Sequence, residues 1–393
     1  MADSDTKSLD PTYWEYIRLD QLLNLQGGIE GGDVETVDEL HFIVIHQAIE
    51  LCFKLVIREL RESRRVLAQD SIREEHIQEA ALHLARVNEG LAVCSTHFTF
   101  MEALGTQGFL SFRDKLGSSS GAQSFQMREV EALLGMPQSE RVKVLERLRR
   151  ELPDAGLASA FEGFILDPLK AIVDRIEGQI AVKEAQGMIS DPDVFVRSYV
   201  RGALEDIEQR GTVRSNLFRW LFRTPITDSE PGSTDDSHQA DQEAVRAFVD
   251  DYLRRGEGAG WAPSQVKGAE QFLRGGAEAP LDWPTERARA ALLFIETYAD
   301  LPLLAWPRLL LDRLVELESR LVAFRNEHAR TVERIIGDRP GTGGSAGIRY
   351  LDLTRDARVF PELAVVRGIL IPRAVRAPLT NTEGYGFTYK ATD

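Results

Sequence analysis

Cysteine and histidine are scarce in this sequence. Among 393 residues there are two cysteines, Cys52 and Cys94, and seven histidines. Two thiols provide neither a disulfide scaffold nor the ligand set of a zinc finger. Because reduced cysteines are typical of the cytoplasm, we expect a cytoplasmic protein.

Targeting and membrane-spanning signals are also missing. The first ten residues are polar and acidic and lack the basic and apolar regions of a secretory signal. We find no uninterrupted run of about 18 apolar residues, so we expect no membrane span. Lys and Arg number 47 against 62 Asp and Glu, which gives a formal net charge of −15. Since binding to phosphates needs clustered cations, this excess of acid argues against a nucleic-acid partner.

What the sequence does contain is helical periodicity. Apolar residues recur at helix spacing over 37–69, 73–104, 124–135, 138–152, 158–184, 192–210 and 304–337. Strand-like alternation is rare. The sequence therefore predicts an all-α fold, with 1–393 forming one large helical domain. Residues 226–284 are rich in Gly, Pro, Ser and Asp, and we expect them to be a polar surface insertion or linker within that domain.

Recognisable nucleotide and metalloprotease motifs are absent from the sequence: there is no phosphate-binding loop, no dinucleotide fingerprint and no H-E-x-x-H. The densest glycine cluster spans 341–347, directly after the long helix at 304–337. Gly341 and Gly343 would allow the backbone to approach a ligand closely. A flexible helix end is the alternative explanation, and the glycines alone favour it.

Two histidines are candidates for chemistry. His328 lies in the long helix and supplies the imidazole that an axial haem ligand requires. His46 lies in an apolar helix, with Phe42 four residues earlier on the same face, and it could act as a base or hydrogen-bond partner in a pocket. Taken singly, both are more simply explained as core or surface histidines.

Arg113 is a candidate anion ligand. It follows Phe112 and precedes the small residues of 117–121. An arginine in such surroundings can bind a carboxylate through two parallel hydrogen bonds. An ion pair with Asp114 or another acidic residue is the alternative, and Arg113 taken alone favours it.

Four sequence blocks carry a more specific pattern when they are taken in order. They are Tyr13-x-x-Tyr16-Ile17-Arg18-Leu19-Asp20-Gln21, Asp38-Glu39-x-x-Phe42-Ile43-x-x-His46-Gln47, Phe112-Arg113-Asp114-x-Leu116-Gly117-x-Ser119-Ser120-Gly121, and His328-x-x-Thr331-Val332-x-Arg334-x-Ile336-Gly337 with Gly341-Thr342-Gly343-Gly344. In this order the blocks closely resemble the tryptophan 2,3-dioxygenase family. Residues 150–300 carry little of the resemblance.

The resemblance implies an all-helical homotetramer that contains haem b and acts on L-tryptophan. Such an enzyme cleaves the indole 2,3-bond with O2 and forms N-formylkynurenine, the first step of the kynurenine route. The resemblance also implies His328 as the proximal haem ligand, His46 as the distal histidine that binds the indole N–H, and Arg113 as the carboxylate clamp. The further residues that it implies are Gly341 and Gly343 near the cofactor, Thr342 at the substrate's ammonium and carboxylate groups, Phe42, Leu116 and Ser120 in the pocket wall, and Tyr13, Tyr16 and Ile17 reaching a neighbouring subunit.

Some positions depart from the family pattern. Val37 stands where the family usually has histidine, and Cys52 stands where it has tryptophan. After Gly337 the family usually has Phe-Lys, whereas here residues 338–340, Asp-Arg-Pro, precede the glycine loop. Two alternatives therefore stay open. One is a haem-dependent mono-oxygenase of the same fold that acts on tryptophan, a substituted tryptophan or another aromatic amino acid. The other is a haem sensor without catalytic activity. The combination of His46, Arg113 and Thr342 favours the dioxygenase.

Overall fold

The fold is helical almost throughout. The computed structural model describes residues 10–28, 31, 34–117, 119–151, 162–224, 235–276, 279–341 and 347–379. Within these ranges the strands are limited to β1 (Gly275–Gly276) and β2 (Ala279–Pro280), a short antiparallel pair. The prediction of an all-α fold is confirmed.

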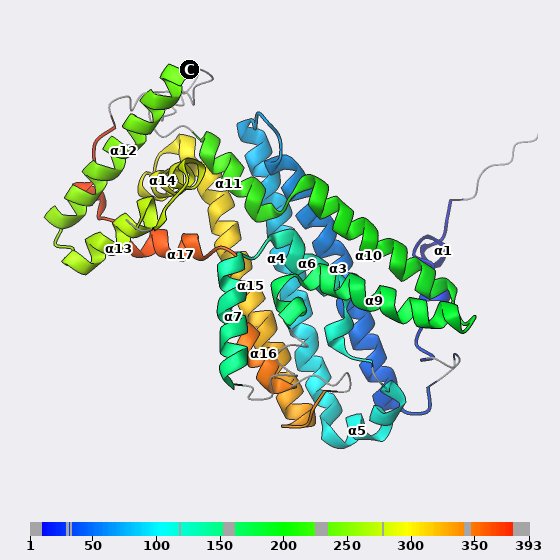
Figure 1. The fold of residues 1–393 in the computed structure, drawn as a ribbon. Coiled ribbons are helices and arrows are strands. Elements are labelled where there is room, and N and C mark those ends of the chain that lie inside the picture. The colour runs from blue at the N-terminus through cyan, green and yellow to red at the C-terminus, as the bar shows by residue number, and fades with distance from the viewer. Residues whose placement is uncertain are drawn as a thin grey trace, which may run out of the picture.

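Three long helices form the centre of the molecule (Figure 1). They are α3 (Val37–Leu67), α4 (Glu74–Met101) and α15 (Ala305–Ile336), and α4 packs against both of the others. α15 ends at Gly337, whose φ of 61° suits glycine and stops the helix at the predicted residue.

The antiparallel pair α3 and α4 is packed closely. A Cβ atom added to Gly90 would lie 2.7 Å from Cγ2 of Val56, so glycine is needed for the two backbones to approach here. Further along the pair, Nε2 of His41 lies 2.9 Å from the carbonyl oxygen of Phe100. These contacts fix the register of the two helices.

Shorter helices surround this centre. They are α1 (Tyr13–Tyr16), α2 (Leu19–Leu22), α5 (Gly105–Phe112), α6 (Phe125–Leu134), α7 (Gln138–Glu151), α9 (Pro168–Ala185), α10 (Asp191–Arg210), α11 (Val213–Arg223), α16 (Ile348–Thr354) and α17 (Pro361–Gly368), with the 3₁₀ turns η1 (Glu102–Leu104), η2 (Arg113–Leu116), η3 (Gly121–Gln123), η4 (Pro302–Leu304) and η5 (Arg373–Val375). The predicted helix over 158–184 is not continuous: residues 162–166 are helical, Asp167 interrupts the helix, and 158–161 lie outside the described residues. α9 begins at Pro168 because proline fits the first turn of a helix, and the Asp167 carboxylate caps that turn by accepting from the Lys170 N–H.

Within the predicted insertion 226–284, residues 226–234 and 277–278 lie outside the described ranges, and most of the remainder is helical. α12 (Asp235–Gly258), α13 (Pro263–Arg274) and α14 (Trp283–Thr297) form a lobe at one end of the molecule, next to α17 (Figure 1). Val245 and Val249 of α12, one helical turn apart, are fully buried, and they belong to the same apolar core as the central helices. The segment therefore packs as part of the fold, and its boundaries as an insertion stay a prediction.

One helix of the described ranges, α3, is long and apolar enough to cross a membrane, with a mean hydropathy of 1.7 over an 18-residue window. Polar residues such as His46, Gln47 and Glu50 interrupt α3, so it contains no uninterrupted apolar run of that length. A core helix of a globular protein passes the same test. In this fold α3 packs against α4, but Val44, Leu51 and Leu55 are exposed by 42%, 52% and 66%.

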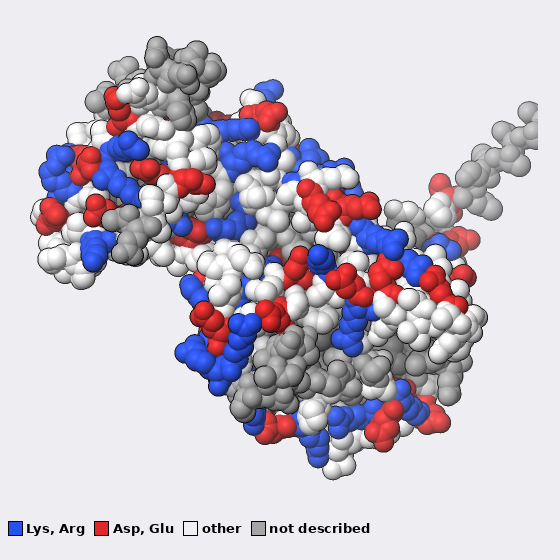
Figure 2. Space-filling model, viewed as in Figure 1, with Lys and Arg blue, Asp and Glu red and all other residues white. Residues whose placement is uncertain are grey.

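Charges of both signs are mixed on the surface. On the face shown in Figure 2, Lys and Arg lie among Asp and Glu without forming one continuous basic area. Many of them pair, as Arg197 of α10 does with Glu184 of α9 at 2.9 Å. The expectation that no nucleic acid is bound stays a prediction.

Candidate active site

A cavity of about 520 Å³ opens among α3, α4, α5, α6 and α15. Its lining is mostly apolar, and its volume falls within the roughly 300–1,000 Å³ that is usual for small-ligand sites. The cavity brings together residues of three of the four sequence blocks. The predicted site residues that line it are Phe42, His46, Arg113, Leu116, Ser120, His328 and Gly341.

His328 reaches this cavity from α15. The ring of Phe98 stacks on its imidazole, with centroids 5.1 Å apart and planes 10° apart, and Phe324 lies one turn earlier on the same helix. Burial lowers the pKa of His328 to about 4. At neutral pH the imidazole is therefore uncharged, which is the form that binds a metal.

His46 faces the same cavity from α3. Its Nδ1 lies 2.8 Å from the backbone carbonyl of Phe42. Because a carbonyl only accepts, Nδ1 carries the proton and Nε2 keeps its lone pair. Burial lowers the pKa of His46, although the bond to Phe42 and the charge of Glu50 oppose this shift. The side chain is thus a neutral hydrogen-bond acceptor.

Arg113 opens η2 and lies at the end of the cavity nearest Gly341. Its Nη2 donates to the carbonyl oxygen of Pro340 at 2.8 Å, which ties η2 to the segment after α15. Within the described ranges it forms no ion pair, so the alternative pairing with Asp114 does not occur there. A guanidinium has several further N–H donors for a bound carboxylate.

An aromatic wall adjoins Arg113. The rings of Phe42, Phe109 and Phe112 pack with centroid separations of 5.4–5.9 Å. Phe109 lines the cavity together with Phe42, whereas Phe112 supports both from behind and is fully buried. Such a wall suits a flat aromatic ring.

A charged cluster in the cavity was missed by the sequence analysis. Arg128 pairs with Glu131 at 2.8 Å, and Arg325 lies 3.5 Å from the same carboxylate. Burial alone would raise the pKa of Glu131, but the two guanidinium groups hold it below its usual value. Arg128 and Glu131 are three apart on α6 and look like a surface pair in sequence, so only the packing of α15 reveals the cluster.

Other predicted site residues are not placed in this cavity. Tyr13 and Tyr16 lie on the surface, exposed by 72% and 80%, and Ile17 is exposed by 37%. Their assignment to a neighbouring subunit stays a prediction. Thr342 and Gly343 lie outside the residues that the structure describes, so their roles also stay predictions.

Comparison with known proteins decides the family. A family model described as tryptophan 2,3-dioxygenase matches residues 2–158 and 264–370. This chain belongs to the tryptophan 2,3-dioxygenase family. It is 35% identical to "Tryptophan 2,3-dioxygenase 2" of Ralstonia nicotianae, over 97% of this chain and 98% of that protein. It is also 34% identical to "Tryptophan 2,3-dioxygenase" of Sorangium cellulosum, over 96% and 88% of the two chains.

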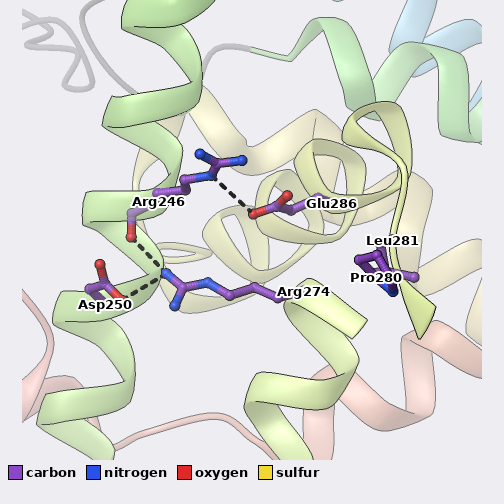
Figure 3. Close-up of a pocket in the computed structure, with 6 residues that line it drawn as sticks. All are labelled: Arg246, Asp250, Arg274, Pro280, Leu281 and Glu286. Atoms are coloured by element: carbon purple, nitrogen blue, oxygen red, sulfur yellow. Dashed lines mark hydrogen bonds and ion pairs between the residues drawn. The ribbon is translucent and has the colours of Figure 1, made fainter. Parts of the chain in front are cut away.

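The family match leaves out residues 159–263, which include α10, α11 and α12. A second hollow, of about 360 Å³, lies where α12 meets α13 and α14 (Figure 3). There Arg274 pairs with Asp250 at 2.8 Å, and Arg246 lies 3.9 Å from Glu286. Its charged groups thus pair with one another, and the cavity with the two histidines is the better candidate for the family's chemistry.

The depressed pKa of His328 predicts a pH dependence of stability in protein purified without haem. The unfolded chain takes up a proton near pH 6.5, whereas the folded chain does so only near pH 4. The contribution of His328 to the free energy of unfolding is therefore fully present above pH 6.5. It is lost as the pH decreases to 4, and the loss is about 3 kcal/mol at most. Urea unfolding at pH 7 and pH 4.5 measures this loss. His328→Phe should lose less stability than the wild type over the same pH interval. An equal loss would show that His328 does not cause this pH dependence.

Proposed function

We propose that this protein is a haem-dependent tryptophan 2,3-dioxygenase, which cleaves the indole 2,3-bond of L-tryptophan with O2 and forms N-formylkynurenine. The observation that carries the proposal is the pairing of His46 and His328 in one largely apolar cavity with Arg113 at its end. Family membership makes the chain an oxidoreductase that acts on tryptophan, and the cavity supplies the residues for that reaction.

The residues of the cavity fit haem b. Neutral His328, on which the ring of Phe98 stacks, would hold the iron of the cofactor. Arg128 and Arg325 share the single carboxylate of Glu131, and the positive charge that remains in the lining would attract the carboxylates of the cofactor. Haem held there would supply the iron chemistry that lets O2 react with the substrate.

The remaining groups would position the substrate. Arg113 would bind the carboxylate of tryptophan through the N–H groups that Pro340 does not use. Nε2 of His46 would accept a hydrogen bond from the indole N–H, because Phe42 already holds the proton of Nδ1. The ring of Phe42, 4.0 Å from the His46 ring, would lie against the indole and exclude water. Together these contacts fix the indole by one polar bond in an apolar slot.

One assay separates the dioxygenase from the alternatives. The protein is loaded with haem, reduced, and given L-tryptophan and O2, while the absorbance of N-formylkynurenine is followed. Since both oxygen atoms enter that product, turnover should need no reductant beyond the initial reduction, and ¹⁸O2 should label the product twice. A product with one label that forms only with added reductant or peroxide would indicate a mono-oxygenase. Normal O2 binding without turnover of any aromatic amino acid would indicate a sensor.

We further propose that a second copy of the chain covers the α3 stripe, which we define as Leu40, Val44, Leu51 and Leu55. These residues are 39–66% exposed and recur at spacings typical of helix–helix interfaces. An apolar stripe of this kind on a surface helix usually marks an interaction site. The contact between the α3 stripe and a second copy would contribute to the homotetramer that the family resemblance implies.

The double variant Leu51→Glu/Leu55→Glu is expected to dissociate the oligomer, because it would place carboxylates in an apolar contact. Light scattering after size-exclusion chromatography measures the mass, and circular dichroism checks that the helices persist. Val365→Glu on α17 is a matched control, since Val365 is 41% exposed and lies in the other lobe. An unchanged mass for the double variant would show that the stripe is not an interface.

A further inference from the structure

The two cysteines of the chain meet between α3 and α4. Cys52 lies one turn from Val56 on α3, and Cys94 lies one turn from Gly90 on α4. Because Gly90 faces Val56 in an antiparallel pair, the register places Cys52 opposite Cys94. Burial and the neighbouring Cys52 raise the pKa of the Cys94 thiol. Both are free thiols in this structure.

The backbones of α3 and α4 approach each other closely one turn from the two cysteines. A disulfide requires Cα atoms roughly 4.4–6.8 Å apart, which is less than the usual separation of packed helices. Gly90 lies one turn from Cys94 and allows α4 to approach α3, because even a methyl group at this position would collide with Val56. The close approach is therefore a local property of the part of the helix pair that carries the cysteines.

We propose that Cys52 and Cys94 form a reversible redox modification site that hydrogen peroxide converts to a disulfide. Cys52 is half-buried and reacts first, whereas Cys94 is fully buried. The Cys52 thiol is oxidised to a sulfenic acid as peroxide is reduced to water. The Cys94 sulfur then attacks that of Cys52, the S–S bond forms, and the hydroxyl leaves as a second water. Two thiols thus lose two electrons and two protons in total.

The surroundings set the rate of this reaction. Burial raises the pKa of the Cys94 thiol, and its contact with Cys52 raises it further. A protonated thiol is a weak nucleophile, so the second step is slower than in redox proteins with acidic cysteines. The pair therefore responds to sustained peroxide rather than to brief exposure.

The disulfide would act on the wall of the active-site cavity. Phe53 follows Cys52 directly, and Phe98 lies one turn after Cys94; both line the cavity, and Phe98 stacks on His328. A covalent link behind these rings would hold α3 and α4 together and restrict their motion. The inference stands without the proposed dioxygenase activity, because it concerns only the thiols.

The test uses the full chain, purified under reductant and then exposed to hydrogen peroxide. Free thiols are alkylated in denaturant, and the intact mass is measured. In the wild type we expect both alkylation sites to disappear together, a mass loss of two hydrogens, one cross-linked peptide that joins Cys52 to Cys94, and full reversal by dithiothreitol. The melting temperature should rise on oxidation.

Two single variants serve as controls. Cys52→Ser and Cys94→Ala each keep one thiol and should show neither the cross-linked peptide nor the rise in melting temperature; alanine at position 94 avoids burying a hydroxyl. The proposal is overturned if both wild-type thiols remain alkylatable at saturating peroxide. It is also overturned if Cys52 proceeds to sulfinic acid while Cys94 stays free.

Discussion

His328→Ala is expected to be purified without haem under conditions in which the wild type is fully loaded. The imidazole of His328 is the side chain that would hold the iron, and its burial keeps it in the neutral, metal-binding form. Alanine removes that imidazole. Iron content and the Soret absorbance after reconstitution measure the effect, and the expected loss of bound haem is nearly complete.

The matched control is His46→Ala, which removes the other histidine of the cavity. This variant should keep its haem, since His46 is assigned to the substrate and not to the iron, but it should turn tryptophan over slowly. Adding free imidazole to His328→Ala should restore haem binding, because the cavity left by the side chain can admit the ring. Full haem occupancy of His328→Ala without imidazole would refute the ligand assignment.

Periodicity predicted the helices that carry the two histidines, whereas the family blocks predicted their roles. Each lies on a helix that periodicity identifies, and Gly337 marks the end of the α15 helix in both sequence and structure. Only the family blocks implied that His46 and His328 face one cavity, since periodicity does not show which helices pack together. The sequence also did not predict which ring nitrogen of His46 carries the proton, because this depends on the contact with the Phe42 carbonyl.

Composition and periodicity disagree in the lobe. Gly, Ser and Asp in 226–242 favour a polar loop, and Gly and Pro extend that prediction to 284. Val245 and Val249 recur at helix spacing within that range and are buried in the core, so periodicity was the better guide. The guanidinium of Arg325 was missed for another reason: it lies in an apolar helix, and its partner Glu131 comes from a distant part of the chain.

Arg113→Ala is expected to keep its haem and to raise the KM for L-tryptophan sharply. The bond to Pro340 holds the guanidinium at the end of the cavity, beside the aromatic wall that would receive the indole. A desolvated charge pair of this kind contributes about 2–5 kcal/mol, so kcat/KM should fall by about 30-fold or more. Arg113→Lys should recover only part of this loss, because an ammonium does not form two parallel bonds to a carboxylate.

Two comparisons make the Arg113 prediction specific. Lys115 lies on the same 3₁₀ turn but pairs with Glu35 at 2.8 Å, away from the cavity, so Lys115→Ala should leave the KM unchanged. Tryptamine lacks the carboxylate that Arg113 would bind, so wild type and Arg113→Ala should bind it with similar affinity, as measured by the shift of the haem spectrum. If Arg113→Ala weakened tryptamine as much as tryptophan, the side chain would shape the cavity in general rather than hold the carboxylate. A loss of affinity for tryptophan but not for tryptamine would indicate that Arg113 binds the carboxylate of the substrate. The indole would then lie at His46.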